Sequence, residues 1–212
     1  KGFGTVVTGT TISGTVLPED TVEVLPQQIT TRVRNIQVHD ANVSTAYAGQ
    51  RTALNLHGIE KQIIQRGNVL SEPGLLRPTY MLDVSLLLLP SAERPLKNRT
   101  RVRIYHRTSE LLARVVLFDR EELLPGDETY VQLRLEAPAV VMARDRYIVR
   151  QYSPVVTIGG GQILFVHPKK HTTKDVVFSQ FRTLHTGSLE EVVEVYVKEA
   201  GFEPVTPRAI SG

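Results

Sequence analysis

The sequence has no cysteine and no tryptophan among its 212 residues. The lack of cysteine excludes disulfides and thiolate metal sites, and it fits a reducing compartment. Apolar runs such as Leu86–Leu89 and Ala139–Ala143 have only the length of a buried strand. They fall well short of the roughly 20 apolar residues that a membrane-spanning helix needs. We therefore expect a cytoplasmic protein with no membrane partner.

One stretch of the chain has no negative charge. The net charge is +3, and the excess lies in residues 76–168, which hold 13 Lys and Arg against 10 Asp and Glu. Between Glu93 and Glu110 the charged residues are all cations: Arg94, Lys97, Arg99, Arg101, Arg103 and Arg107. Such a patch can contact phosphates. The alternative is a strand with the arginines on its solvated face and Val102 and Ile104 inward; the pattern favours neither.

Two β units are predicted before residue 169. Runs rich in β-branched residues alternate with turn residues in residues 1–75 and predict a small antiparallel barrel. Its expected strands are Thr5–Ile12, Thr21–Leu25, Thr31–Val38, Arg51–Leu56 and Asn68–Leu70. Residues 76–168 predict a second β unit, with strands at Tyr80–Leu88, Thr100–Arg107, Leu111–Phe118, Thr129–Leu135, Tyr147–Gln151 and Val155–Val166.

Residues 169–212 change to a helical period. A short helix is expected at Lys174–Leu184, and Ser188 followed by Glu191 has the spacing of a capping box. The helix that follows has one apolar face, an i,i+4 pair of Glu194 and Lys198, and Gly201 at its end. Thr206-Pro207 is typical of a further helix start. The expected fold is therefore mainly β: two consecutive antiparallel barrels followed by a partial α-helical segment.

No catalytic or metal site is evident in the sequence. The glycines of Gly2-Phe3-Gly4 and Gly159–Gly161 lack the spacing of a phosphate loop or a dinucleotide fingerprint, and glycines in strands more often mark bends or close approaches. His167 and His171 have the spacing of a helical metal pair, but Pro168 between them breaks the helix that this spacing requires. The residues themselves predict a binding module.

Several motifs occur in the order found in the elongation factor Tu superfamily. In the first unit these are Gly4–Gly9, Ser13-Gly14, Gly49–Arg51 and Gln65–Leu70, and they resemble the second domain of that superfamily. In the second unit they are Tyr105–Ser109, Leu124–Asp127, Arg146–Arg150 and Thr157–Gly161, and they resemble the third domain. Each motif is modest alone, but their shared order is specific.

Within the superfamily the chain is most similar to the bacterial selenocysteine-specific factors, the SelB type. The features that favour this branch are Gly49-Gln50-Arg51, the strand end Gln37–His39 and the Thr157–Gly161 run. Members of this branch add winged-helix domains after the third domain, and the helical tail fits the start of the first one. Because the chain begins at Lys1, inside the first motif, we expect it to be a fragment.

The resemblance implies a set of partners and cofactors. It implies binding of selenocysteyl-tRNA and delivery to the ribosome at recoded UGA codons, with an mRNA hairpin held by absent C-terminal domains. GTP and Mg²⁺ would bind an absent GTPase domain before Lys1, so we expect no cofactor and no enzymatic activity in this chain, which is expected to be a monomer. The alternatives are the core of another translational GTPase, such as elongation factor Tu, or a double barrel that docks proteins; only RNA binding would weaken steeply with salt.

The resemblance also assigns an aminoacyl pocket. Arg51 occupies a position that is typically Asn in elongation factor Tu, and a buried guanidinium there would pair with the selenolate of selenocysteine and disfavour neutral serine. The alternative is a structural ion pair between Arg51 and Asp40. Thr8 would line the same pocket and Gln50 would contact the 3′ end of the tRNA, although both are also ordinary barrel residues.

The acceptor stem of the tRNA would contact the second barrel. Candidate residues are arginines and glycines whose side-chain or backbone N–H groups suit phosphates: Arg107, Arg150, Gly159, Gly160 and Gly161. Helical RNA is recognised mainly through its backbone and shape, so no base-specific contacts are expected there.

Overall fold

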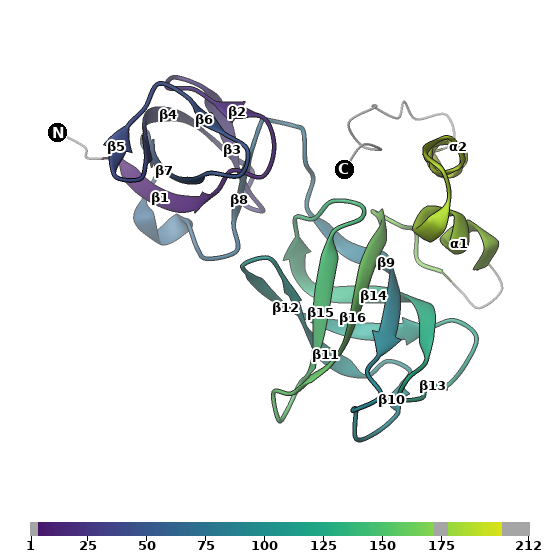
Figure 1. The fold of residues 1–212 in the computed structure, drawn as a ribbon. Helices are drawn as coiled ribbons and strands as arrows, with labels where there is room; N and C mark the ends of the chain where they lie inside the picture. The colour runs from purple at the N-terminus through teal and green to yellow at the C-terminus, as the bar shows by residue number, and fades with distance from the viewer. Residues whose placement is uncertain (1–3, 172–177, 201–212) are drawn as a thin grey trace. The chain divides into compact units, whose positions relative to one another are not determined.

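The computed structural model describes residues 4–171 and 178–200, and the chain divides into two compact units, Lys1–Arg77 and Pro78–Gly212 (Figure 1). Almost all regular structure is antiparallel β, with two helices near the C-terminal end, which confirms the predicted mainly β class. The predicted helix end at Gly201 and helix start at Thr206-Pro207 lie outside the described residues.

The first unit is a curved antiparallel sheet. Its strands are β1 (Thr5–Thr10), β2 (Thr15–Val16), β3 (Thr21–Leu25), β4 (Ile29–Val38), β5 (Ala41–Asn42), β6 (Ala46–Tyr47), β7 (Arg51–Leu56) and β8 (Val69–Ser71), with a 3₁₀ turn at Lys61–Ile63. Pairing runs β1-β7-β4-β3-β8, β5 adds to β4, and β2 pairs with β6. Inward residues of β3, β4 and β7 alternate with exposed ones and form an aliphatic core that includes Ile36, Leu54 and Leu56.

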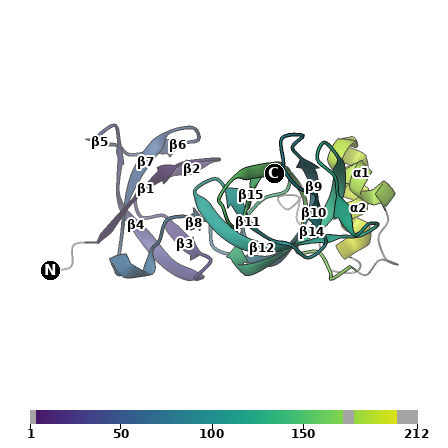
Figure 2. The same ribbon diagram turned by 90° about the horizontal axis from the view of Figure 1, so that it is seen from below.

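The second unit contains a closed barrel. Its strands are β9 (Thr79–Leu88), β10 (Leu96–Lys97), β11 (Arg101–His106), β12 (Ser109–Leu117), β13 (Glu122–Leu123), β14 (Glu128–Ala139), β15 (Arg146–Gln151) and β16 (Thr157–Val166). The order β11-β12-β14-β9-β16-β15 returns to β11, while β10 and β13 form a separate ribbon. Figure 2 shows these strands as a ring around the core. Closure pairs every strand on both sides, so the barrel has no exposed edge.

The arginine-rich stretch forms an outward strand face, as one of the two interpretations predicts. Val102 and Ile104 of β11 are 0% and 2% exposed, while Arg101 and Arg103 point to the other side of the barrel wall. Arg99 precedes the strand in a turn with φ of 62°. The period-2 alternation of β11 therefore follows directly from its sequence.

Helices α1 (Phe178–Thr186) and α2 (Leu189–Ala200) pack on the barrel beside β9 and β16 (Figures 1 and 2). The predicted capping box is present, since Ser188 N donates to Glu191 Oε2 at 2.8 Å and Glu191 N donates to Ser188 Oγ at 3.4 Å. Buried side chains of both helices meet barrel residues in one apolar cluster: Phe118, Leu164, Phe181, Leu184, Val192, Val195 and Tyr196. The helices thus share a core with the barrel wall.

Candidate functional site

The outer face of β1 and β7 brings two predicted site residues together. Thr10 lies opposite Arg51 and Thr8 lies opposite Ala53 in the pairing of these strands. Because directly opposed residues share a face, Thr8 is the diagonal neighbour of Arg51 on that face. Both Thr8 and Arg51 are exposed, whereas the alternate β7 residues Thr52 and Leu54 are buried. The face is thus open to solvent within this unit.

The guanidinium of Arg51 forms no ion pair with any residue that the structure describes. This includes Asp40, the partner of the alternative interpretation. Asp40 instead occupies the tip of the β4–β5 hairpin, where φ is 62°. Arg51 is the first residue of β7 and is exposed within the first unit. The buried guanidinium of the pocket hypothesis therefore requires another molecule or another part of the protein to cover Arg51, and the hypothesis stays a prediction.

Gln50 has a structural contact in the turn before Arg51. Tyr47 N donates to Gln50 Oε1 at 2.8 Å, and Gln50 N donates to Tyr47 O at 3.2 Å. The side-chain oxygen therefore stabilises the turn Tyr47–Gln50, while the side-chain nitrogen has no partner within the described part of the chain. A contact from Gln50 to a nucleotide would use that nitrogen as the donor.

Two arginines of β11 lie over one aromatic ring in the second unit. The Tyr152 ring lies 4.6 Å from the guanidinium carbon of Arg101 and 5.2 Å from that of Arg103. Arg101 Nε also donates to Glu136 at 2.8 Å, and Arg103 pairs with Glu110. Each of these two arginines therefore has a carboxylate partner, and a phosphate would have to compete for it.

The two arginines predicted to contact the acceptor stem lie at opposite ends of the β11–β15 pair. Arg150 is opposite Arg103, whereas Arg107 lies in the turn after β11. Four residues along a strand separate these points by about 13 Å. Arg150 Nη2 donates to Val155 O at 2.9 Å and its guanidinium lies 5.5 Å from the Tyr105 ring, while its Nε is buried with no partner among described residues.

Asp145 holds the Arg107 end of the barrel together. Its Oδ2 lies 2.8 Å from His106 Nε2 and accepts from Met142 N at 3.0 Å, while its Oδ1 accepts from Arg107 Nη2 at 2.8 Å. Burial raises the pKa of Asp145, but the hydrogen bonds from His106, Arg107 and Met142 outweigh it and lower the pKa to about 2. The Arg107 side chain is thus engaged with Asp145 in this chain.

We expect Asp145→Asn to destabilise the second unit by about 2 kcal/mol at pH 7, because a pKa shift of one unit is worth about 1.4 kcal/mol. The folded pKa lies below the ordinary value of 3.8, so this stability is present above pH 4 and lost as pH falls towards 2. Urea denaturation at pH 7 and pH 2.5 measures the difference. The matched control is Asp127→Asn, an aspartate that is 46% exposed; equal losses in the two variants would contradict the prediction.

The three glycines of β16 have a packing role. A Cβ would lie 2.4 Å from Leu87 O at Gly159, 2.6 Å from Tyr147 O at Gly160 and 1.9 Å from Ser85 O at Gly161. Glycine is therefore needed for the close approach of β16 to its neighbours, whether or not a ligand binds there. Gly159 pairs with Val149, next to Arg150, so these two candidates do lie together.

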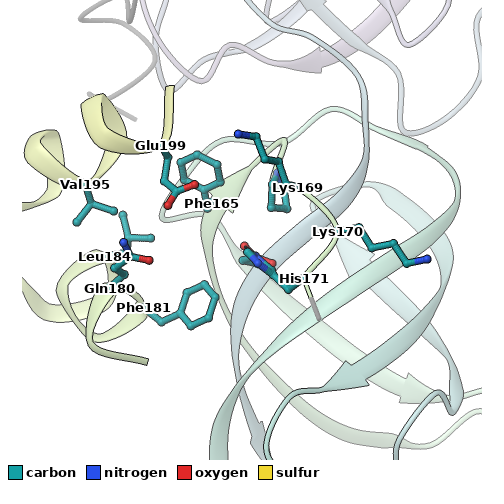
Figure 3. Close-up of a pocket in the computed structure, with 11 residues that line it drawn as sticks. Phe165, Lys169, Lys170, His171, Gln180, Phe181, Leu184, Val195 and Glu199 are labelled. Atoms are coloured by element: carbon teal, nitrogen blue, oxygen red, sulfur yellow. The ribbon is translucent and has the colours of Figure 1, made fainter. Parts of the chain in front are cut away.

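A cavity of about 250 Å³ is lined by residues of both the helices and the barrel (Figure 3). Asp83 in its wall is 2% exposed; its Oδ2 lies 2.6 Å from His171 Nε2, and its Oδ1 accepts from Gln132 Nε2 at 3.1 Å. The Nε2 atom of His171 is thus held by its contact with Asp83.

In the described ranges, 4–171 and 178–200, no three His, Asp or Glu side chains gather as metal ligands. Neither helix in these ranges is long and apolar enough to cross a bilayer.

Sequence reasoning missed the ring of Tyr152 and the partners Asp145 and Asp83. The arginine alternation indicated an outward basic face, but no spacing rule links it to Tyr152, which follows the neighbouring strand β15. An aspartate next to a turn, such as Asp145, has the same appearance as a solvated charge. Together, the described residues offer an open face in the first unit, with a cation that has no ion-pair partner among them, and a basic, aromatic face in the second.

Two family models match the chain. Residues 4–71 match elongation factor Tu domain 2, and residues 83–170 match the beta-barrel domain of the selenocysteine-specific elongation factor. The two matches cover most of the β structure described above and fall in separate compact units.

Individual relatives give the same result. The chain is 38% identical over 201 residues to a selenocysteine-specific elongation factor of Desulfomicrobium baculatum, which covers 95% of the chain and 32% of that protein. It is 33% identical over 180 residues to the protein of that name from Haemophilus influenzae, covering 83% of the chain and 28% of the relative. The chain also resembles a crystal structure of a bacterial selenocysteine-specific elongation factor, EF-Sec, with a TM-score of 0.80 and 25% identity. The match covers 100% of the chain and 33% of the EF-Sec chain. The chain therefore spans about a third of these relatives.

Proposed function

The chain belongs to the selenocysteine-specific elongation factors, and from this membership we propose that it is the tRNA-binding core of a longer factor. In this proposal the first unit binds the aminoacylated 3′ end of selenocysteyl-tRNA and the second unit contacts the acceptor stem. The whole factor delivers this tRNA to the ribosome at recoded UGA codons in the cytoplasm, with an mRNA hairpin bound by further domains. The partners named in the proposal come from the family.

The observation that carries the proposal is the exposure of the Arg51 guanidinium. It lies on an open face beside Thr8 and Thr10, with no ion pair in the described part of the chain. A selenol is more acidic than a thiol, whose pKa is about 8.5, so selenocysteine is anionic at neutral pH and can pair with Arg51. Serine brings no charge, and once the tRNA covers the face it leaves the cation desolvated without compensation.

No motif or side-chain cluster for GTP or Mg²⁺ is evident in the sequence or among the described residues. The sequence has no phosphate-loop motif, and the described side chains include no gathered acidic ligands. We therefore assign GTP hydrolysis to a domain outside these 212 residues. The contribution of the chain itself is to bind and orient the aminoacyl end and the stem of the tRNA.

The test is the affinity of the whole factor with GTP for selenocysteyl-tRNA and for seryl-tRNA, with Arg51 and with Arg51→Asn. A charged contact is worth about 1.5–3 kcal/mol, so we expect the variant to bind selenocysteyl-tRNA about tenfold to a hundredfold more weakly. Binding of seryl-tRNA should become stronger, because the variant has no cation for the neutral hydroxyl to leave desolvated. Equilibrium filter binding measures both dissociation constants.

The matched control is Arg77→Asn, which removes another exposed arginine of the same unit. It removes the same charge, and we expect it to leave the ratio of the two affinities unchanged. An unchanged ratio in Arg51→Asn would refute Arg51 as the group that recognises the selenolate. Equal affinity of the unmutated factor for both tRNAs would instead support the core of a general translational GTPase.

A further inference from the structure

We propose that Thr11 and Thr52 are positioning residues for Arg51. Their hydroxyl pair fixes the backbone from which the Arg51 side chain extends, and so determines how sharply the factor distinguishes selenocysteyl-tRNA from seryl-tRNA. The inference rests on the proposed function, because it concerns the same aminoacyl contact. It adds two residues that do not themselves touch the aminoacyl group.

Thr11 contacts the residues on both sides of Arg51. Its backbone N–H donates to Gln50 O at 3.0 Å, and its Oγ1 lies 3.1 Å from Thr52 Oγ1. Its carbonyl accepts from Gly49 N at 2.7 Å. The residue that follows β1 therefore binds the turn and the first residues of β7 at three points, and Arg51 lies between two of them.

The burial of Thr52 indicates that its hydroxyl contributes hydrogen bonds in addition to packing. Thr52 is 4% exposed and faces the aliphatic core, with Val38 as its opposite residue in β4. Valine has nearly the same shape, and at a buried strand position it avoids the desolvation of a hydroxyl. The hydroxyl is instead satisfied by Thr11 and, at 3.4 Å, by Gln50 O. Thr52 and Gln50 are the two chain neighbours of Arg51, so the Thr52 hydroxyl makes both contacts directly beside it.

The position of the Gln50–Thr52 backbone matters because few other contacts restrain the Arg51 side chain. Its side chain is exposed and forms no ion pair with any described residue, so the location of the guanidinium depends on the backbone of residues 50–52. A functional contact needs its groups held within about 0.5 Å by supporting interactions. Without the hydroxyl pair, the Gln50–Thr52 segment keeps its backbone bonds but loses its side-chain restraint.

The experiment uses the whole factor with GTP and four variants: Thr11→Val, Thr52→Val, Thr52→Ser and Arg51→Asn. Loss of one neutral hydrogen bond corresponds to about fivefold in an equilibrium constant, so each valine variant should lower the selenocysteyl-to-seryl affinity ratio by about fivefold. The affinity for seryl-tRNA and the melting temperature should stay unchanged. Thr52→Ser retains the hydroxyl and should restore the ratio.

The matched control is Thr31→Val, which removes another buried hydroxyl of the same sheet, one that donates to His57 O at 2.6 Å. It should leave the affinity ratio unchanged. A normal ratio in both valine variants, together with a reduced ratio in Arg51→Asn, would overturn the positioning role and leave the proposed function intact. A parallel loss of both affinities and of thermal stability would also overturn it, since that is the effect of a purely structural bond. An unchanged ratio in Arg51→Asn would overturn the proposed function itself.

Discussion

Replacement of Gly161 by alanine is expected to destabilise the second unit by about 3 kcal/mol or more, the upper range for overpacking. The added Cβ would lie 1.9 Å from Ser85 O and 2.7 Å from Ser85 C, both backbone atoms of β9. Ser85 O has little room to move, because it also accepts a buried hydrogen bond of 2.8 Å from the Tyr147 hydroxyl. Relief of the clash therefore requires β16 to separate from β9, which opens the closed barrel.

Urea denaturation followed by circular dichroism measures this loss. The matched control is Gly9→Ala, because a Cβ at Gly9 meets no heavy atom within 4 Å and the position is in a strand. We expect Gly9→Ala to change the free energy of unfolding by less than about 0.5 kcal/mol, as for most surface substitutions. Similar values for the two variants would contradict the close-approach role of Gly161.

Much of this fold could be predicted from the sequence because its signals are local. The alternation of Val102 and Ile104 with arginines predicted the inward face of β11, and the structure confirms it. The spacing of Ser188 and Glu191 predicted the start of α2 through a capping box, which is also present. The ion pair of Glu194 with Lys198, at 2.7 Å, follows from the same helical period. Each of these features involves residues no more than four positions apart.

The candidate site required information that no local pattern contains. Arg51 and Thr8 were chosen from a family resemblance, and their shared face depends on the register of β1 against β7, whose residues are about 40 positions apart. The exposure of Arg51 within the first unit is likewise a property of the folded sheet, and no local sequence pattern states it. The partners Asp145 of Arg107 and Asp83 of His171 are 38 and 88 positions away. Contacts between residues this far apart in the sequence form only once the strands of the barrel have paired.

A second large effect is expected at the contact between the barrel and its helices, where His171→Ala should destabilise the second unit by about 3 kcal/mol at pH 7.5. The substitution leaves the carboxylate of Asp83 buried without its partner at 2.6 Å, and breaking a buried pair costs about 3–5 kcal/mol. The ring of His171 also packs edge-on against Phe118 at 5.5 Å and Phe181 at 5.8 Å. Figure 3 shows His171 facing Phe181 across the cavity.

The pH dependence of this loss distinguishes the charge from the packing. Burial raises the pKa of Asp83, contacts with His171 and Gln132 lower it, and the charge of Glu199 on α2 raises it. Without His171 the folded-state pKa rises further above the unfolded value, so the penalty is full above the folded pKa and disappears as pH falls and the carboxyl binds a proton. We therefore expect the loss in His171→Ala to shrink by about half or more between pH 7.5 and pH 5, because a protonated Asp83 carboxyl no longer carries a buried charge.

Urea denaturation at both pH values measures this change, with His57→Ala, which removes an exposed histidine of the first unit, as the matched control. The double variant Asp83→Asn with His171→Ala should recover part of the stability, because it removes the unpaired charge that the single variant leaves behind. A loss of equal size at pH 5 and pH 7.5, with no recovery in the double variant, would assign the effect to the lost ring contacts. In that case His171 would hold the helices on the barrel through its aromatic neighbours, and Asp83 would contribute through Gln132 alone.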